Sequence, residues 1–315
     1  MRGLLAAVVI GAALFGASVA QAGTLSFAGG VVTYQASPGE PNHVFLISDS
    51  DGVVAVDLGA PVTAGTGCTS DSANAASCAF PPGVNRVEIL AGDMSDYVNT
   101  AALELPNRIE GEAGNDELTT GGIYNLYSVM DGGPGADTFE SVNGTVDYSD
   151  RTNPVTVTVG DDQANDGEAG ENDRIPSGIG WVIGGGGNDH MSAGEVAEVK
   201  FKGGAGDDVL EAEVFAYLIG NKGDDRLLGG KDAQYIGGGS GADLLRGGPS
   251  EDSLGGGEGN DEIIGGLGAD YMNGDDGNDT LRSHDGFKDR VNGDAGFDRA
   301  HGDALDVLMR IERLY

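Results

Sequence analysis

The chain has 315 residues, with 57 glycines and with 51 acidic side chains against 17 lysines and arginines, for a formal charge of −34. Such a balance leaves nothing to neutralise phosphate groups, so it excludes nucleic acid as a partner. Aromatic residues make up only 6% of the chain, which disfavours a bulky globular core. A disordered or merely solvated acidic chain would share this composition, but neither would space its acids regularly.

The first 22 residues have the layout of a secretory signal peptide. One arginine, Arg2, precedes an apolar run, and small residues follow at Ala20 and Ala22. This pattern predicts cleavage after Ala22, with cleavage after Ala20 or an uncleaved anchor as the alternatives. No later segment is apolar enough to cross a bilayer. We therefore expect a secreted, extracellular protein without a transmembrane segment.

Residues 23–106 form an N-terminal segment whose sequence pattern is typical of short strands. Runs such as VVTYQAS, HVFLIS, GVVAVDL and NRVEIL are β-branched or alternating, and they are separated by Gly, Pro, Asn and Asp. The two cysteines, Cys68 and Cys78, predict a disulfide that closes a short polar loop. A metal or redox role is disfavoured because the spacing is not CxxC and no histidine flanks it.

A nine-residue phrase then recurs along the chain. Isolated copies occupy 111–119 and 132–140, and a further two occupy 184–192 and 203–211. Residues 146–175 interrupt the series, where we expect a strand pair and a stretched turn. From 220 to 282 the phrase repeats seven times in strict register, and looser copies follow around Asp289 and Asp298.

Each phrase predicts a turn followed by a short strand. Its first six residues are rich in glycine, which supplies the positive φ angles of a tight turn. The eighth position in the seven regular copies is always apolar and is expected to face inward, as one side of a strand does. These residues are Leu227, Ile236, Leu245, Leu254, Ile263, Met272 and Leu281. Two phrases make one coil, and stacked coils form two parallel sheets around a thin apolar core.

The sixth position predicts two columns of acids along the edges of this stack. Every second copy lies on the same edge, so residues 18 apart in sequence are about one strand spacing, roughly 4.7–4.9 Å, apart in space. One column is Asp225, Asp243, Asp261 and Asp279, and the other is Gln234, Asp252 and Asp270. Stacked carboxylates repel, so a divalent cation is expected between the turns. Calcium suits them because it takes about six to eight oxygens in flexible geometry, whereas magnesium needs a rigid octahedron and zinc prefers Cys and His.

The phrase resembles the RTX nonapeptide repeat, GGxGxDxUx, from residue 111 to about 301 in broken form and over 220–282 without interruption. The resemblance implies an all-β parallel β-roll in which several calcium ions bridge successive turns, with disorder when calcium is absent. The expected ligands are Asp116, Asp137, Asp189, Asp208, Asp225, Asp243, Asp252, Asp261, Asp270 and Asp279. The chain departs from the family in its N-terminal signal peptide, in Gln234 and in Ser250. We expect at least one weak or empty calcium position on the edge that carries Gln234.

The catalytic signatures of hydrolases are absent from the sequence. It contains no HExxH and no GxSxG, and its four histidines, His43, His190, His284 and His301, are scattered. We therefore expect no enzyme but an exported calcium-binding roll with a structural or surface-interaction role, whose cell-surface or glycan partner is unknown. The alternative is a toxin-like, haemolysin-type or hydrolytic protein that is active through its N-terminal segment. The expected division is 1–22 signal peptide, 23–106 strand-rich segment, 107–219 interrupted repeats, 220–302 regular roll and 303–315 C-terminal cap.

Overall fold

The computed structural model describes residues 22–48, 51–79, 85–121, 128–195 and 198–314. The expected signal peptide, apart from Ala22, lies outside these residues. All regular elements of the described chain are strands, and no helix there is long and apolar enough to cross a membrane. The all-β class predicted from the sequence is confirmed.

The strands form three sheets. The 16-stranded sheet contains β1 (Gly23–Ala28), β2 (Val31–Gln35), β5 (Val62–Ala64), β8 (Arg86–Leu90), β10 (Asn107–Glu110), β12 (Val129–Asp131), β14 (Thr145–Asp147), β17 (Trp181–Ile183), β19 (Val199–Ala205), β21 (Ala216–Lys222), β23 (Gln234–Ser240), β25 (Ser253–Glu258), β27 (Tyr271–Gly277), β29 (Arg290–Asn292), β30 (Ala295–Gly296) and β32 (Val307–Met309). The seven-stranded sheet contains β3 (His43–Ser48), β4 (Gly52–Asp57), β6 (Thr69–Ser72), β7 (Ala75–Ala79), β9 (Tyr97–Ala102), β11 (Glu117–Thr120) and β13 (Thr138–Glu140). The ten-stranded sheet contains β15 (Val155–Val159), β16 (Gly167–Glu168), β18 (His190–Ala193), β20 (Val209–Ala212), β22 (Arg226–Leu228), β24 (Leu244–Gly248), β26 (Glu262–Gly266), β28 (Thr280–Arg282), β31 (Arg299–His301) and β33 (Arg313–Leu314).

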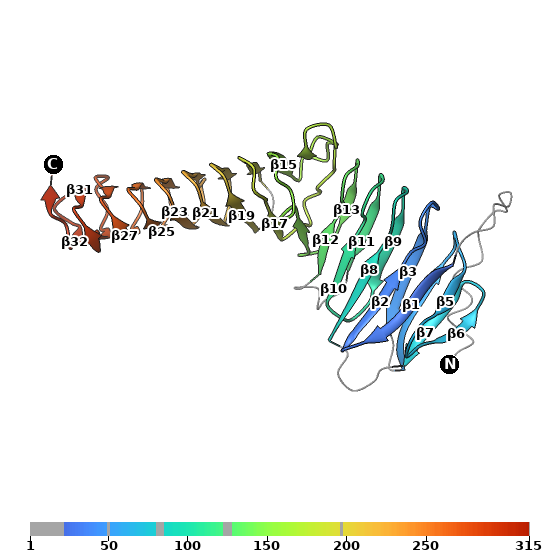
Figure 1. Ribbon diagram of the computed structural model, residues 1–315. Helices are drawn as coiled ribbons and strands as arrows, with labels where there is room; N and C mark the ends of the chain where they lie inside the picture. The colour runs from blue at the N-terminus through green and yellow to red at the C-terminus, as the bar shows by residue number, and fades with distance from the viewer. Residues whose placement is uncertain (1–21, 49–50, 80–84, 122–127, 196–197, 315) are drawn as a thin grey trace.

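From β8 onward, successive coils stack into a parallel β-solenoid. Each coil gives one strand to the 16-stranded sheet and the next to the opposite sheet, so β21, β23 and β25 pair in parallel on one side while β22, β24 and β26 pair on the other. Figure 1 shows these coils as rungs of an elongated molecule, with β1 and β32 toward opposite ends. The parallel roll predicted from the nine-residue phrase is therefore confirmed.

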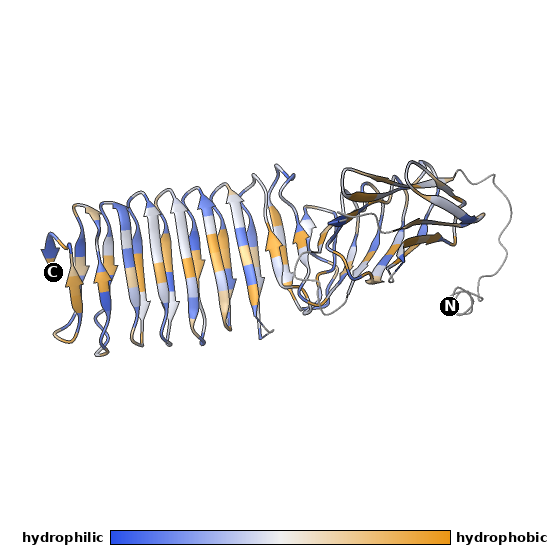
Figure 2. Ribbon diagram, turned by 90° about the horizontal axis from the view of Figure 1, so that it is seen from below, coloured by the Kyte–Doolittle hydropathy of each residue, from blue (hydrophilic) through white to orange (hydrophobic). Residues whose placement is uncertain are grey.

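The core is a thin apolar ladder between the two sheets. All seven eighth-position residues of the regular copies are buried, and on one side Leu227, Leu245, Ile263 and Leu281 lie in register. The matching apolar bands on successive strands are visible in Figure 2. One buried side chain per strand gives little apolar burial for each residue that must be ordered.

The solenoid begins earlier than the regular repeats do. Strand β2 pairs in parallel with β8, and β8 pairs in parallel with β10, so the 16-stranded sheet runs without a break past residue 106. Antiparallel pairs, β1 with β2 and β3 with β4, close the N-terminal end of the stack. The N-terminal segment is thus continuous with the roll, because its strands provide the hydrogen-bonding edge on which the first coil forms.

The interruption at 146–175 changes only one side of the solenoid. Strands β14 and β15 enter different sheets, and an antiparallel strand pair is formed by β15 with the short β16. Strand β14 keeps the 16-stranded sheet continuous between β12 and β17. On the opposite side the seven-stranded sheet ends at β13 and the ten-stranded sheet begins. At the C-terminal end, β32 and β33 extend both sheets rather than closing them.

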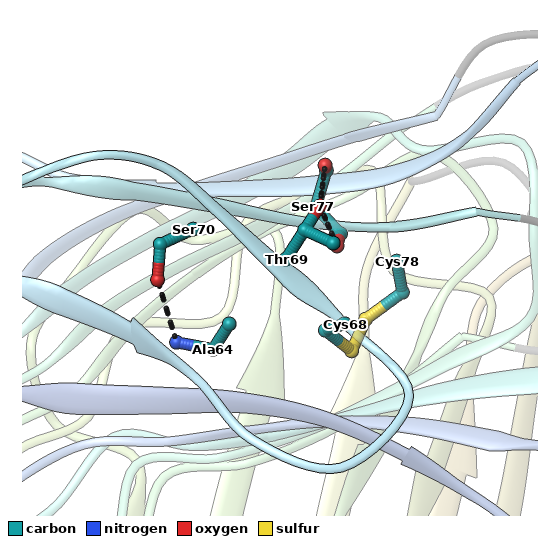
Figure 3. The surroundings of a disulfide bond; sticks show 6 residues. All are labelled: Ala64, Cys68, Thr69, Ser70, Ser77 and Cys78. Carbon is teal, nitrogen blue, oxygen red and sulfur yellow. Dashed lines mark hydrogen bonds between the residues drawn. A yellow bond between two sulfur atoms is a disulfide. The ribbon is translucent and has the colours of Figure 1, made fainter.

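The predicted disulfide between Cys68 and Cys78 is present, with its Cα atoms 4.2 Å apart. It joins the residue before β6 to β7, as Figure 3 shows. Thr69 and Ser77, the next pair along this ribbon, are hydrogen-bonded through their side chains at 3.3 Å. The disulfide therefore fastens a polar hairpin onto the N-terminal end of the molecule.

Candidate metal centre

One edge of the solenoid carries a ladder of buried aspartates, which we call the first-edge ladder. The main-chain N–H of each aspartate donates to Oδ1 of the aspartate one coil further on: Asp225 to Asp243 at 2.7 Å and Asp243 to Asp261 at 2.8 Å. The same bond recurs in register along two runs. They are Asp96, Asp116, Asp137 and Asp173, and then Asp189, Asp208, Asp225, Asp243, Asp261, Asp279 and Asp298.

The other edge carries a shorter second-edge ladder. The N–H of Gln234 donates to Asp252 at 2.7 Å, and the series continues through Asp270, Asp289 and Asp306. Before Gln234 the same register positions hold the buried apolar residues Ala216 and Val199. The two columns predicted from the 18-residue spacing are confirmed, and carboxylates occupy the second edge only from Asp252 onward.

The second carboxylate oxygen, Oδ2, is buried without a hydrogen-bond partner at most ladder positions. Within the described part of the chain this holds for Asp96, Asp116, Asp137, Asp208, Asp225, Asp243, Asp252, Asp261, Asp270, Asp279, Asp289 and Asp298. Buried polar atoms in folded proteins are almost always paired, so each of these oxygens needs a partner. A cation is the partner that a carboxylate oxygen accepts without a donor hydrogen.

The glycine at the first position of each phrase makes room for this oxygen. A Cβ on Gly238 would lie 2.3 Å from Asp243 Oδ2 and 2.5 Å from the carbonyl oxygen of Gly256 in the next coil. Any larger side chain would therefore displace the carboxylate. The unpartnered oxygen and a main-chain carbonyl of the adjacent coil converge at this glycine, which is the mixture of oxygen donors that calcium takes.

A cation at these edges would need main-chain ligands. Among the described residues, no group of three or more His, Cys, Asp or Glu side chains is placed to hold a metal ion. Each gap between coils offers at most two ladder carboxylates, whereas calcium takes about six to eight oxygens. The remaining ligands would be turn carbonyls, which the glycine-rich turns leave accessible, and water.

The raised pKa values of the ladder carboxyl groups also favour a bound cation. Burial raises the pKa of Asp225, Asp270 and Asp279 to about 7, and neighbouring carboxylates add to this rise while the N–H bond from the preceding coil opposes it. Burial also raises the pKa of Asp252 and Asp261 to about 6. In the absence of a cation, the groups with a pKa of about 7 would therefore be about half protonated at neutral pH, whereas Asp252 and Asp261 would be mostly ionised.

Three aspartates around the interruption differ from those with an unpartnered Oδ2, because protein donors satisfy both of their carboxylate oxygens. Asp189 accepts the N–H of Val155 at 2.9 Å on Oδ1 and that of Gly185 at 2.8 Å on Oδ2. Asp166 accepts two main-chain N–H groups, and Asp173 accepts an N–H and the hydroxyl of Tyr148. We call these three residues the closed joint. These three carboxylates need no cation, although they are as deeply buried as the ladder aspartates.

At the start of the second-edge ladder, the side-chain amide of Gln234 stands where other copies have a carboxylate. Its side-chain amide donates to the carbonyl oxygens of Val214 at 2.9 Å and Asp232 at 3.0 Å, while Oε1 remains buried without a partner. A neutral donor thus occupies carbonyl oxygens beside the position that an aspartate fills elsewhere. The expectation of a weak or empty site on this edge stays a prediction that this geometry supports.

All ten expected ligands lie in the two ladders, and nine of them have the unpartnered oxygen; Asp189 does not. The expected set did not include Asp96, Asp289 and Asp298, which have it as well. Each of these three could have been found from the apolar residue two positions later, Val98, Val291 or Ala300, which is buried in the core. The first and fourth positions of the phrase lack glycine at Asp96 and Asp289, whereas Gly293 and Gly296 occupy them at Asp298.

The nine-residue repeat also matches a known family. The profile of the RTX calcium-binding nonapeptide repeat (4 copies) matches residues 106–122, 177–195, 217–245 and 246–281. No curated protein matches the chain significantly. The matched residues carry both ladders through their regular part and include Asp116, Asp189 and Asp225. This chain therefore carries RTX calcium-binding nonapeptide repeats, which fold as a parallel β-solenoid with buried aspartate ladders.

Proposed function

We propose that this chain is an exported calcium-binding β-roll that orders on calcium and serves a structural or surface-interaction role. The observation that carries the proposal is the set of twelve buried Oδ2 atoms without a hydrogen-bond partner. Leaving one buried charged group unsatisfied costs about 1–3 kcal/mol or more. A divalent cation between coils would supply the missing partner along each ladder.

Calcium is the cation that this donor set favours. The available ligands are aspartate oxygens and main-chain carbonyls, which are hard donors, and the turns that carry them are flexible and glycine-rich. Magnesium requires a near-ideal octahedron and keeps its water, and zinc selects nitrogen and sulfur ligands that the ladders lack. We assign one ion between each consecutive pair of unpartnered carboxylates, which gives several ions on each edge and none at the closed joint.

Calcium binding would supply much of the folding free energy of the roll. Each ion adds about 1.4 kcal/mol at tenfold excess over its dissociation constant, so several ions together reach the scale of a domain's total stability. The apolar ladder alone is thin, and glycine is costly to order. The roll is therefore expected to be open where calcium is scarce and folded where it is plentiful.

Two features support export, and the placement of the buried carboxylates supports a non-catalytic role. The N-terminal 22 residues have the signal-peptide pattern, and the disulfide between Cys68 and Cys78 suits an oxidising compartment. Most of the carboxyl groups whose pKa is raised by burial are ladder residues, with Asp131 and Asp166 among the exceptions. The proposal therefore assigns the molecule to scaffolding or attachment outside the cell, with no catalytic step.

Calorimetric titration of calcium into the secreted chain, with circular dichroism on the same samples, tests the proposal. Asp261→Asn keeps an acceptor for the N–H of Asp243 but replaces Oδ2, so it is expected to lower the number of ions bound and to raise the calcium concentration needed for strand formation. Glu262→Gln is the matched control, because Glu262 lies next in sequence and pairs with Arg282 at the surface. Equal strand content with chelator and with millimolar calcium would overturn the proposal.

A further inference from the structure

The outward face of the 16-stranded sheet carries a row of aromatic side chains. Six residues lie in register across neighbouring strands, and we call them the aromatic row. They are Trp181, Lys200, Tyr217, Tyr235, Ser253 and Tyr271. The next residue in each strand, such as Phe201, Leu218 or Ile236, is buried in the core. Because side chains alternate along a strand, the whole row faces outward.

The members of the row from Trp181 to Tyr235 contact one another. The rings of Tyr217 and Tyr235 stack with centroids 4.9 Å apart and planes at 9°, and Phe215 meets both edge-on. The ammonium of Lys200 lies 5.4 Å from the ring centroids of both Trp181 and Tyr217. Ring stacking and cation–π contacts hold these side chains in fixed positions on the sheet.

The row remains accessible at the tyrosines. Tyr235 is 49% exposed and Tyr271 is 43% exposed, although large aromatic side chains on a monomer are usually buried. A depression of about 360 Å³, lined in part by Ser253, Lys288 and Arg290, lies between the two rings. Gly237 and Gly255, which lie two residues after Tyr235 and Ser253 in their strands, keep the sheet surface low beside the row.

The charge on the row differs from that of the rest of the chain. The row contains no carboxylate, and Arg290 follows Tyr271 in the register. Basic side chains thus stand near both ends of the row, Lys200 within it and Arg290 just beyond it, in a chain with a formal charge of −34. Acidic groups are nearby: Glu198 pairs with Lys200 at 2.9 Å, and Glu251, Asp252 and Asp270 line the depression together with the bases. The net charge of the chain repels extended polyanions, and the mixed bases and carboxylates beside the row favour neither sign of charge, so the row suits an uncharged polymer.

We propose that the aromatic row is a binding surface for a neutral polysaccharide with an extended, β-1,4-linked chain of pyranose rings. The apolar face of a sugar ring stacks on an aromatic face, and its hydroxyls can accept from Lys288 and Arg290 and donate to Glu251. Tyr235 and Tyr271 are two strands apart, about 9.6 Å from the strand spacing. In an extended β-1,4-linked chain the same ring face recurs at every second sugar, a separation close to this one.

This inference names the surface partner of the proposed function and rests on it, because calcium orders the coils that carry the row. The test is titration of cellohexaose, a neutral β-1,4-linked oligosaccharide, into the full secreted chain in millimolar calcium. Binding is measured by calorimetry and by the fluorescence of Trp181, the single tryptophan of the chain, at the end of the row. Oligogalacturonate and single-stranded DNA are the anionic comparisons, and both are expected to bind more weakly than cellohexaose.

The double variant Tyr235→Ala/Tyr271→Ala is expected to weaken binding of cellohexaose by about tenfold or more, since two stacking faces are lost. Ser253→Ile, which fills the depression with a strand-favouring side chain, is expected to weaken it as well. Phe297→Ala is the matched control, because Phe297 is an exposed aromatic residue beside Asp298 on the first edge. Circular dichroism in calcium verifies that each variant is folded.

Several results would overturn the inference. They are a calcium-ordered wild type that fails to bind cellohexaose, tyrosine variants that are folded and bind as the wild type does, or tighter binding of either anionic probe. The proposed function fails separately, through identical circular dichroism with and without calcium. An ordered chain that binds no sugar therefore rejects only the polysaccharide surface.

Discussion

The main-chain N–H of Asp243 donates to Oδ1 of Asp261 at 2.8 Å, while Oδ2 of Asp261 stays buried without a partner. One carboxylate thus has two distinct tasks. Oδ1 fixes the register between coils and is satisfied by the protein, whereas Oδ2 is left for a ligand from outside the chain. This division separates aspartates that hold the fold from aspartates that also attract a cation, and it makes the two kinds distinguishable by experiment.

Asp189→Asn tests the closed joint. Because both oxygens of Asp189 accept main-chain N–H groups, the amide would turn a donor toward one of them. The expected loss of stability is about 1–3 kcal/mol, both with calcium and with chelator. Calorimetry should find the number of bound calcium ions unchanged. A reduced number of ions would mean that Asp189 is a ligand, as the sequence predicted.

Gln234→Asp is expected to extend the second-edge ladder by one site. The substitution replaces an amide that donates to the carbonyls of Val214 and Asp232 by a carboxylate one coil before Asp252. Calcium titration should then give one additional ion, and the added stability at tenfold excess is about 1.4 kcal/mol. With chelator the variant should be less stable than the wild type, since the added carboxylate is buried without a cation. An unchanged ion count would contradict this expectation.

The cation-free roll is expected to become more ordered on acidification. Burial raises the pKa of Asp225, Asp270 and Asp279 from the ordinary value of 3.8 to about 7 in the folded state. A raised folded-state pKa stabilises the fold fully below the unfolded value, and this stabilisation is lost as the pH rises through the folded value. With chelator, circular dichroism should therefore show strand content growing as the pH falls from about 8 toward 4.

Calcium should compete with these protons. Titrations at pH 7 in buffers of different ionisation enthalpy are expected to show proton release on binding, and the apparent calcium affinity should fall as the pH falls from 7 to 5. Calcium binding without proton release would show that the ladder carboxylates are already ionised in the cation-free chain, and the acid-induced ordering should then be absent as well.

Gly259→Ala and Gly237→Ala should have opposite effects. Gly259 has a φ of 135°, and a Cβ there would lie 1.6 Å from the carbonyl oxygen of Gly241 in the preceding coil. Gly237 has no neighbouring atom within 4 Å of such a Cβ. We expect the first substitution to cost at least about 2 kcal/mol in calcium and the second to be neutral or stabilising by up to about 1 kcal/mol. Thermal or denaturant unfolding in calcium measures both.

The sequence by itself determined the fold of the regular coils and the position of their acids. An apolar residue at the eighth position of each regular phrase and, except at Gln234, an acid at the sixth leave one solution, because strand side chains alternate and stacked coils repeat every 18 residues. Leu245, Ile263 and Leu281 lie in register in the core as expected, and Asp243, Asp261 and Asp279 follow one another along one edge.

Only the tertiary structure decided which carboxylates need a cation and which side chains share a face. Asp189 and Asp208 occupy the same position of the phrase, yet Gly185 donates to the second oxygen of Asp189 and no described residue donates to that of Asp208. The interruption brings Val155 to Asp189 from 34 residues away, which no repeat spacing encodes. Trp181 and Tyr217 likewise join one row only because spacers of unequal length return β17, β19 and β21 to the same register. Hydrogen-bond donors and strand pairing are properties of chain segments that meet in space, so a local pattern cannot specify them.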